Sequence, residues 1–217
     1  MADVNEVKDA IMRDFMTAYR RIPRPAGQVK AAQNYAARIA QALVAAFRKH
    51  VGPDVMTDGM ITPETAQALV VDPLATGWRL VAGEAAKIQT KLNENDGYSI
   101  RSSGANPDEN RLEGMVSLVS SKPYEEVEPK FYQCFDNIMR ASVDYTLLKT
   151  AHIFEDVGIK AKVRRTTDAG ACKWCQERAG TYDIDDEEAW ARHLDCGCNI
   201  EVVAEKGRKR VRHEYTL

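Results

Sequence analysis

Four of the five cysteines in this chain lie close together near its C-terminus, and this cluster constrains the fold more than any other feature. Cys172 and Cys175 form a Cys-x2-Cys pair, and His193, Cys196 and Cys198 form a His-x2-Cys-x-Cys run. Thiols stay reduced in the cytoplasm, where close-set cysteines are typical of metal sites rather than of disulfide frameworks. We therefore predict a folded metal-binding module at this end of the chain.

The spacing predicts a tetrahedral zinc site, which needs four ligands. Cys172 and Cys175 can reach one ion from a single tight turn. His193, Cys196 and Cys198 offer three candidates for the remaining two positions, and the pattern leaves open which two bind. Because the protein supplies every ligand, the pattern favours a structural Zn²⁺ over a catalytic one. Metal binding would then supply folding free energy to a segment too small for a core of its own.

Other uses of these residues fit the sequence less well. A thioredoxin-type redox pair at Cys172 and Cys175 would need a βαβ context, which is missing, and would leave the second cluster unexplained. The sequence lacks the His-x-Glu and Pro-Cys-x-x-Cys runs of zinc deaminases and the His-Glu-x-x-His run of metalloproteases. The remaining histidines, His50, His152 and His213, are scattered without a companion motif. We therefore expect no enzymatic activity and assign no catalytic residue.

The composition is that of an ordinary globular protein. Hydrophobic residues make up 44% and charged residues 29%, which allows a sizeable core. The 30 basic and 32 acidic residues give a net charge of -2, so the molecule as a whole should not be drawn to nucleic acid. No stretch approaches the roughly 20 apolar residues that span a bilayer, and residues 1–8 lack the apolar core of a secretory signal. We expect synthesis in the cytoplasm and no membrane partner.

Residues 1–157 are expected to form a helical region, because apolar residues recur there at helical spacing in several segments. Thr62-Pro63 and Asp72-Pro73 are both typical of helix starts, since Pro is tolerated at the first helical position. The expected helices cover approximately residues 5–21, 28–49, 62–71, 72–92 and 108–120, with a loop over residues 93–107 that is rich in Asn, Ser, Gly and Asp.

The strongest helical periodicity lies between Pro129 and His152. Its seam positions step by alternating three and four, which predicts a long helix in the core of a bundle; an intermolecular coiled coil is the alternative. Cys134 lies in this seam and is expected to act as a small buried apolar residue. The seam consists of Phe131, Cys134, Ile138, Ala141, Tyr145, Leu148 and His152.

The character of the sequence changes at Gly158, and residues 158–205 are expected to form the small zinc module. Alternating residues predict strands over residues 160–166 and 199–203, on either side of the Cys and His residues. The predicted fold class is therefore a mainly α N-terminal region with a small C-terminal α+β zinc-binding module.

Charged and aromatic residues in and after the module carry further expectations. The acidic run at 183–188 suits a helix N-terminus through the helix dipole. Trp174, Tyr182 and Trp190 are expected to pack around the metal. The tail of residues 206–217 is basic, and it either forms a solvated terminus or touches nucleic acid. Its basic side chains before the last histidine are Lys206, Arg208, Lys209, Arg210 and Arg212.

The segment from residue 164 to residue 203 resembles the C-terminal part of tailed-phage minor head proteins, the head-morphogenesis family with Mu F-like and SPP1-like members. That family typically shows an Asp-led Cys-x2-Cys, a turn that contains Gly, and then His-x2-Cys-x-Cys before a strand. Asp168, Gly180 and the five Cys and His residues stand in this order here. Gly197 stands where the family commonly has Arg, and Leu194 where it commonly has Pro.

The resemblance implies a minor structural component of a phage or prophage head, present in few copies and associated with the portal protein, the major capsid protein or both. Such a protein aids head assembly, is made in the host cytoplasm and resides in the virion head. The basic tail adds the expectation of weak contact with packaged DNA. A nucleic-acid-binding zinc-module protein is one alternative, which the acidic run at 183–188 disfavours. A metal-dependent nuclease or peptidase is another.

Overall fold

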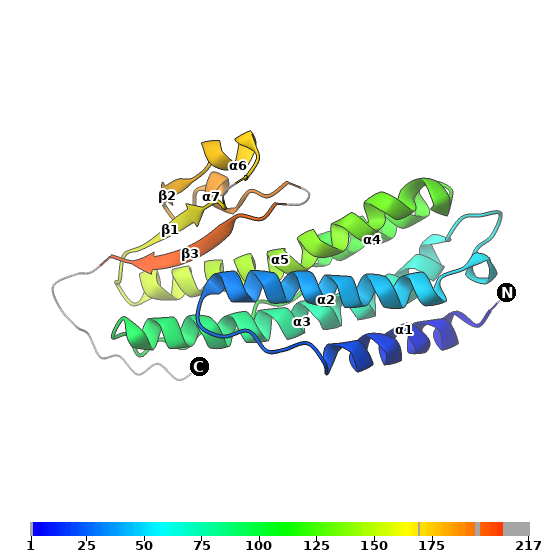
Figure 1. Cartoon of the computed structure of the whole chain (residues 1–217), viewed down its shortest axis with the longest axis horizontal. Helices are drawn as coiled ribbons and strands as arrows, with labels where there is room; N and C mark the ends of the chain where they lie inside the picture. The colour runs from blue at the N-terminus through cyan, green and yellow to red at the C-terminus, as the bar shows by residue number, and fades with distance from the viewer. Residues whose placement is uncertain (1, 169, 194–195, 206–217) are drawn as a thin grey trace.

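The computed structural model describes residues 2–168, 170–193 and 196–205, and the basic tail of residues 206–217 lies outside this part of the chain. The fold is mainly helical with a small three-stranded antiparallel sheet near the C-terminus, which confirms the predicted fold class (Figure 1). The helices are α1 (Val4–Tyr19), α2 (Val29–His50), α3 (Pro63–Asn95), α4 (Glu109–Ser120), α5 (Tyr124–Asp156), α6 (Lys173–Glu177) and α7 (Glu187–Trp190), with a 3₁₀ turn η1 (Pro53–Val55). The strands are β1 (Ala161–Thr166), β2 (Gly180–Tyr182) and β3 (Asn199–Ala204).

The long helices form a bundle around one core. Helices α2, α3 and α5 pack against one another, α1 packs on α2 and α3, and α4 packs on α3 and α5. The buried face of α2 carries large apolar residues four positions apart, so they line up along one stripe of the helix. From this stripe, the ring of Phe47 packs edge-on against Phe131 and Phe135 of α5, with ring centroids 6.0 Å and 5.2 Å apart. Helix α5 is therefore a core helix of this bundle.

Helix α3 corrects one expectation, because Pro73 does not begin a new helix. The helix starts at Pro63, capped by the Thr62 hydroxyl, which accepts a hydrogen bond from the backbone N–H of Thr65. It then continues through Pro73 to Asn95. A proline inside a helix loses one backbone hydrogen bond. Here the side chains on both sides of it are buried in the core, so packing outweighs the local signal. Those side chains include Leu69, Val70 and Leu74.

Helix α5 also begins earlier than its periodicity predicts. It starts at Tyr124, so Pro129 lies in its second turn instead of ahead of it. The buried hydroxyls of Tyr124 and Tyr132 hydrogen-bond to each other at 2.7 Å, which ties this first part of the helix to the rest.

The loop between α3 and α4 lies against α3 and is fastened by polar contacts. The Trp78 indole N–H donates to the carbonyl of Ala105 at 3.0 Å, and the Ala105 N–H donates to the Thr146 hydroxyl of α5 at 3.1 Å. Gly104 comes so close to α3 that a Cβ there would lie 3.1 Å from the carbonyl carbon of Ala82 and 3.2 Å from the nitrogen of Gly83. A Cβ on Gly83 itself would meet nothing within 4 Å.

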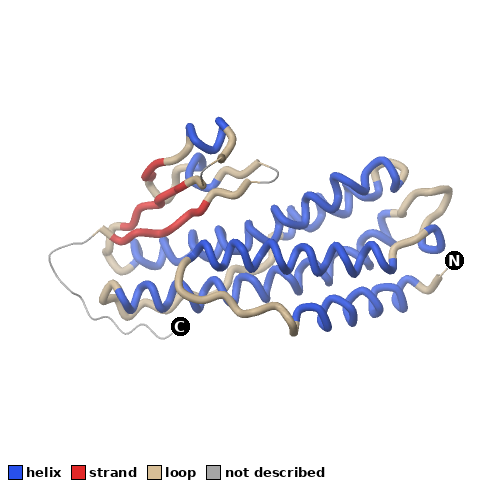
Figure 2. The backbone as a smooth tube through the Cα atoms, in the orientation of Figure 1, coloured by secondary structure: helices blue, strands red, loops and turns tan. Residues whose placement is uncertain are grey.

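The sheet lies along α5 and α2, on one side of the bundle (Figure 2). Its strand order is β2-β1-β3, and Val163 of the central strand pairs with Tyr182 on one side and Val202 on the other. Alternate residues of β1 face inward, where Ala161 and Val163 join the main core. The next inward position holds Arg165, which is 1% exposed. Sequence periodicity predicted β1 and β3, but not the short β2 or α6.

No helix in the described ranges is both long enough and apolar enough to cross a membrane.

The two glycines at the crossing of loop and helix predict opposite effects of the same substitution. Gly83→Ala should raise the free energy of unfolding by about 0.5–1 kcal/mol, since alanine favours the helix and finds open space. Gly104→Ala should lower it by about 1–3 kcal/mol, because the new methyl group meets backbone atoms that cannot move aside. Chemical denaturation of the two variants checks this pair, and a stabilised Gly104→Ala protein would contradict the close approach.

Candidate metal centre

The fold brings all five predicted metal ligands into one small region. Cys172 is the N-cap of α6 and Cys175 lies within it, while His193 follows α7 and Cys196 and Cys198 lead into β3. The His193 Nε2 atom lies 2.9 Å from the Sγ of Cys175 and 3.3 Å from that of Cys172. The Sγ atoms of Cys175 and Cys196 lie 3.8 Å apart.

These donors form two overlapping groups of three that share Cys175. Cys172, Cys175 and His193 form the first, and Cys175, Cys196 and Cys198 form the second; within each, the ligand atoms lie within 4.8 Å of one another. Ligand sulfurs about 2.3 Å from a tetrahedrally coordinated ion are separated by about 3.8 Å. The distance between Cys175 and Cys196 matches this edge. The cluster therefore fits a metal ion, and any four of its members that bind one ion must be drawn from both groups.

The surroundings shift the pKa values of two of the thiols in opposite directions. Burial raises the pKa of Cys175 far above its ordinary value, and the neighbouring thiols of Cys198, Cys172 and Cys196 raise it further. At Cys196, burial also opposes ionisation, but hydrogen bonding by Cys198 and the positive charge of Arg192 outweigh it and lower the pKa. A metal cation among these sulfurs would favour the thiolate form of each ligand, because the cation becomes the largest local charge.

Arg165 contacts the sulfurs from β1, a contact that the sequence pattern did not predict. Its Nη1 donates to the carbonyls of Glu188 and Ala191 at 3.1 Å and 2.5 Å, and its Nη2 lies 3.5 Å from the Sγ of Cys198 and 3.8 Å from that of Cys196. The guanidinium thus connects α7 to the segment that carries Cys196 and Cys198, the cysteine turn. It also places positive charge beside these two thiols. The available signal was an arginine at an inward position of an alternating strand, where a charge is rarely buried without a partner.

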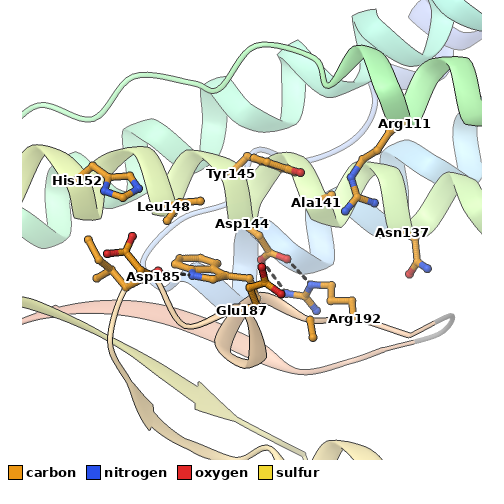
Figure 3. Close-up of a pocket in the computed structure, with 13 residues that line it drawn as sticks. Arg111, Asn137, Ala141, Asp144, Tyr145, Leu148, His152, Asp185, Glu187 and Arg192 are labelled. Atoms are coloured by element: carbon orange, nitrogen blue, oxygen red, sulfur yellow. Dashed lines mark hydrogen bonds and ion pairs between the residues drawn. The ribbon is translucent and has the colours of Figure 1, made fainter.

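A second arginine connects the cysteine turn to the helical bundle (Figure 3). Arg192 forms an ion pair with Asp144 of α5, to which it donates from Nε and from Nη2, the latter at 2.8 Å from Oδ1. Its Nη1 donates to the carbonyl of Cys198 at 3.0 Å and lies 3.4 Å from that of Cys196. Asp144 also accepts a hydrogen bond at 2.9 Å from the side-chain amide of Gln33 on α2. A continuous polar chain therefore runs from α2 through α5 to the cysteine turn.

The aromatic residues divide between two environments, so the prediction that all three surround the metal is wrong for two of them. Trp174 packs beside the cysteines, edge-on to the His193 ring at a centroid distance of 4.9 Å, and the Arg178 guanidinium lies 4.2 Å from its ring centroid. Tyr182 and Trp190 instead pack against the main core. The Tyr182 hydroxyl donates to the carbonyl of Arg178 at 3.0 Å, and the Trp190 indole N–H donates to the carbonyl of Ile184 at 2.8 Å.

A cleft of about 610 Å³ lies between α5 and the segment around α7. Figure 3 shows Tyr145, Leu148 and His152 of α5 on one wall and Asp185 and Glu187 on the other. All three α5 residues belong to the predicted seam, yet Tyr145 and His152 are exposed. The seam turns from the bundle toward the module along the helix, so its second half lines the cleft instead of the bundle core.

No protein-family model, curated protein or solved structure is significantly similar to this chain. Thiolates and imidazole bind soft and borderline transition-metal ions in preference to calcium or magnesium, which prefer oxygen ligands.

Because Cys175 belongs to both groups of donors, Cys175→Ser should abolish tight binding of a thiolate-preferring metal ion. Cys134→Ser is the matched control, since Cys134 is a half-buried thiol on α5 outside the cluster. Anaerobic titration of the reduced proteins with Co²⁺ measures this through the thiolate-to-metal charge-transfer absorbance. The band should appear in wild type and in Cys134→Ser and be lost in Cys175→Ser; its persistence in Cys175→Ser would contradict the shared role.

Proposed function

We propose that this chain is a minor structural protein of a phage or prophage head, associated with the portal protein, the capsid or both, and that its C-terminal module is held by a structural zinc ion. The observation that carries the proposal is the ordered Cys-x2-Cys and His-x2-Cys-x-Cys motif whose five donors converge in the fold. A strand follows the motif directly, and a long helical region precedes it, as in the family that the motif resembles.

The donor geometry supports Cys172, Cys175, His193 and Cys196 as the four zinc ligands. The first three form one group, and Cys196 lies at a tetrahedral edge length from Cys175. Cys198 would then remain a thiol that accepts a hydrogen bond from Arg165, a supporting role common beside metal ligands. When bound, the zinc ion would cross-link α6 to the turn before β3.

Charge balance supports three thiolates and the His193 imidazole as ligands over four thiolates, whichever of Cys196 and Cys198 binds. Three thiolates around a zinc dication leave one net negative charge, and Asp144 adds another. Two buried guanidinium groups, those of Arg165 and Arg192, offset both charges. Four thiolates would leave a buried negative charge without a counterion, which is costly in a region of low dielectric.

The proposed role is mechanical and needs no chemistry at the metal. A zinc-held module on a helical bundle offers a rigid surface for neighbouring head proteins, and the helical region is the larger candidate for docking on portal or capsid. Four of the five acidic side chains at 183–188 are exposed, which disfavours the alternative of a nucleic-acid-binding zinc module. Weak contact with packaged DNA is proposed only for the basic tail of residues 206–217, which lies outside the described residues.

Head particles from a phage or induced prophage that encodes this chain would test the virion assignment. We expect mass spectrometry of purified heads to detect the protein at a few copies per particle, in a ratio to portal protein that does not change on repeated purification. A deletion strain should yield fewer filled heads. Absence of the protein from both mature heads and assembly intermediates, with normal head yield in the deletion strain, would refute the assignment.

The zinc assignment predicts different zinc affinities after substitution of Cys196 and of Cys198. Cys196→Ser should lose zinc or bind it at least about tenfold more weakly, because a direct ligand is removed. Cys198→Ser should retain one zinc per chain with a smaller loss of affinity, since a hydroxyl can still accept from Arg165. Elemental analysis of protein purified under reducing conditions without chelator gives the stoichiometry. The reverse ranking would make Cys198 the fourth ligand.

A further inference from the structure

The ion pair between Arg192 and Asp144 is unlike the others in the described part of the chain. Its side chains are 7% and 8% exposed, and no other ion pair there has both partners so deeply buried. Asp144 belongs to the middle of α5, whereas Arg192 immediately precedes the ligand His193. The pair therefore lies where the helical bundle meets the candidate metal centre.

The pair is stable only while all its hydrogen bonds are made together. Burying two charges is unfavourable unless good geometry and further hydrogen bonds compensate for their lost hydration. Here Gln33 donates to the carboxylate on the bundle side. On the module side, the guanidinium nitrogen that does not contact Asp144, Nη1, donates to the carbonyls of Cys196 and Cys198. If the cysteine turn moved, these donors and the charges behind them would be left unpaired in a buried site.

We infer that Arg192 and Asp144 are positioning residues of the metal site, through which metal binding and the docking of the module on α5 are thermodynamically coupled. The inference rests on the proposed metal site. A bound ion would hold the segment that carries Cys196 and Cys198 in place. The carbonyls of these two residues accept from the Arg192 guanidinium, which pairs with Asp144. Linkage is reciprocal, so if metal binding strengthens docking by some factor, docking strengthens metal binding by that same factor. Weakening the contact between Arg192 and Asp144 should therefore also weaken metal binding.

The two buried arginines differ in the parts of the protein that each connects. Arg165 connects only parts of the module, because its contacts are α7 carbonyls and the two sulfurs. Arg192 connects the module to the bundle. Of the two arginines, only Arg192 can therefore couple the metal site to the helical bundle. The cleft beside it, whose walls come from both α5 and the α7 segment, would consequently keep its shape only in the metal-loaded protein.

The experiment compares zinc affinity in wild type, Asp144→Asn and a matched control, Asp136→Asn. Asp136 lies on the same helix and pairs with Arg140, away from the cluster. Competition with a chromogenic chelator gives the dissociation constant for zinc, and circular dichroism confirms the helical content of each protein. We expect about a tenfold to hundredfold weaker affinity in Asp144→Asn, as for other residues that orient metal ligands, and no change in Asp136→Asn.

A second measurement uses wild type alone, so it does not depend on whether a variant folds. Removing zinc with a chelator should increase hydrogen exchange in β1, β3 and the segment that carries Arg192, while α3 keeps its protection. Arg192→Lys keeps the charge but loses the forked geometry, and it should weaken zinc binding in the same direction as Asp144→Asn.

The outcomes separate the two proposals. If wild type binds one zinc but Asp144→Asn binds it equally well, or if exchange is the same with and without zinc, the coupling is refuted and the metal site stands. If wild type binds no zinc under reducing conditions, the metal site and the coupling both fall. Weaker binding in Asp144→Asn and Arg192→Lys, together with faster exchange after zinc removal, supports the coupling.

Discussion

A three-stranded sheet has one face to bury and little apolar area of its own, and the C-terminal module is built around that constraint. Its inner face carries Ala161, Val163 and Ile200, which complete the core of the helical bundle. Its other end carries the Cys and His residues, which pack as a separate small cluster beside Trp174. The module is therefore packed at two places, by apolar contact with α5 and by the separate cluster that holds the candidate metal ligands.

Helix α5 makes this arrangement possible because it is covered on two sides. One side packs against α2 and α3 inside the bundle, and the other supports β1 and β3 of the sheet. Asp144 is the point where the two sides meet, since its carboxylate accepts from Gln33 of α2 and pairs with Arg192 of the module. Small hydroxyl residues nearby hydrogen-bond back to the helix, so their polar atoms are satisfied in the core. These are Ser142, Thr146 and Thr150.

Local signals predicted most helices and the strands β1 and β3 but failed where packing opposed them. Pro73 is typical of a helix start, yet α3 passes through it because its neighbours are buried on both sides. The seam on α5 predicted one buried face, whereas Tyr145 is exposed at the cleft. Periodicity measures which residues share a face of a helix; it does not say which of several neighbours that face meets.

The sequence by itself determined the fold class and the set of five Cys and His residues that converge, because ligand spacing and helical periodicity are local properties of a chain. Only the tertiary structure decided how the two parts are joined. Arg192 and Asp144 carry no recognisable spacing, and the inward position of Arg165 in its strand does not say which groups it contacts, since these contacts connect segments far apart in the chain. A buried charge is stabilised by whichever partner the fold brings near it, and that partner cannot be found from sequence position alone.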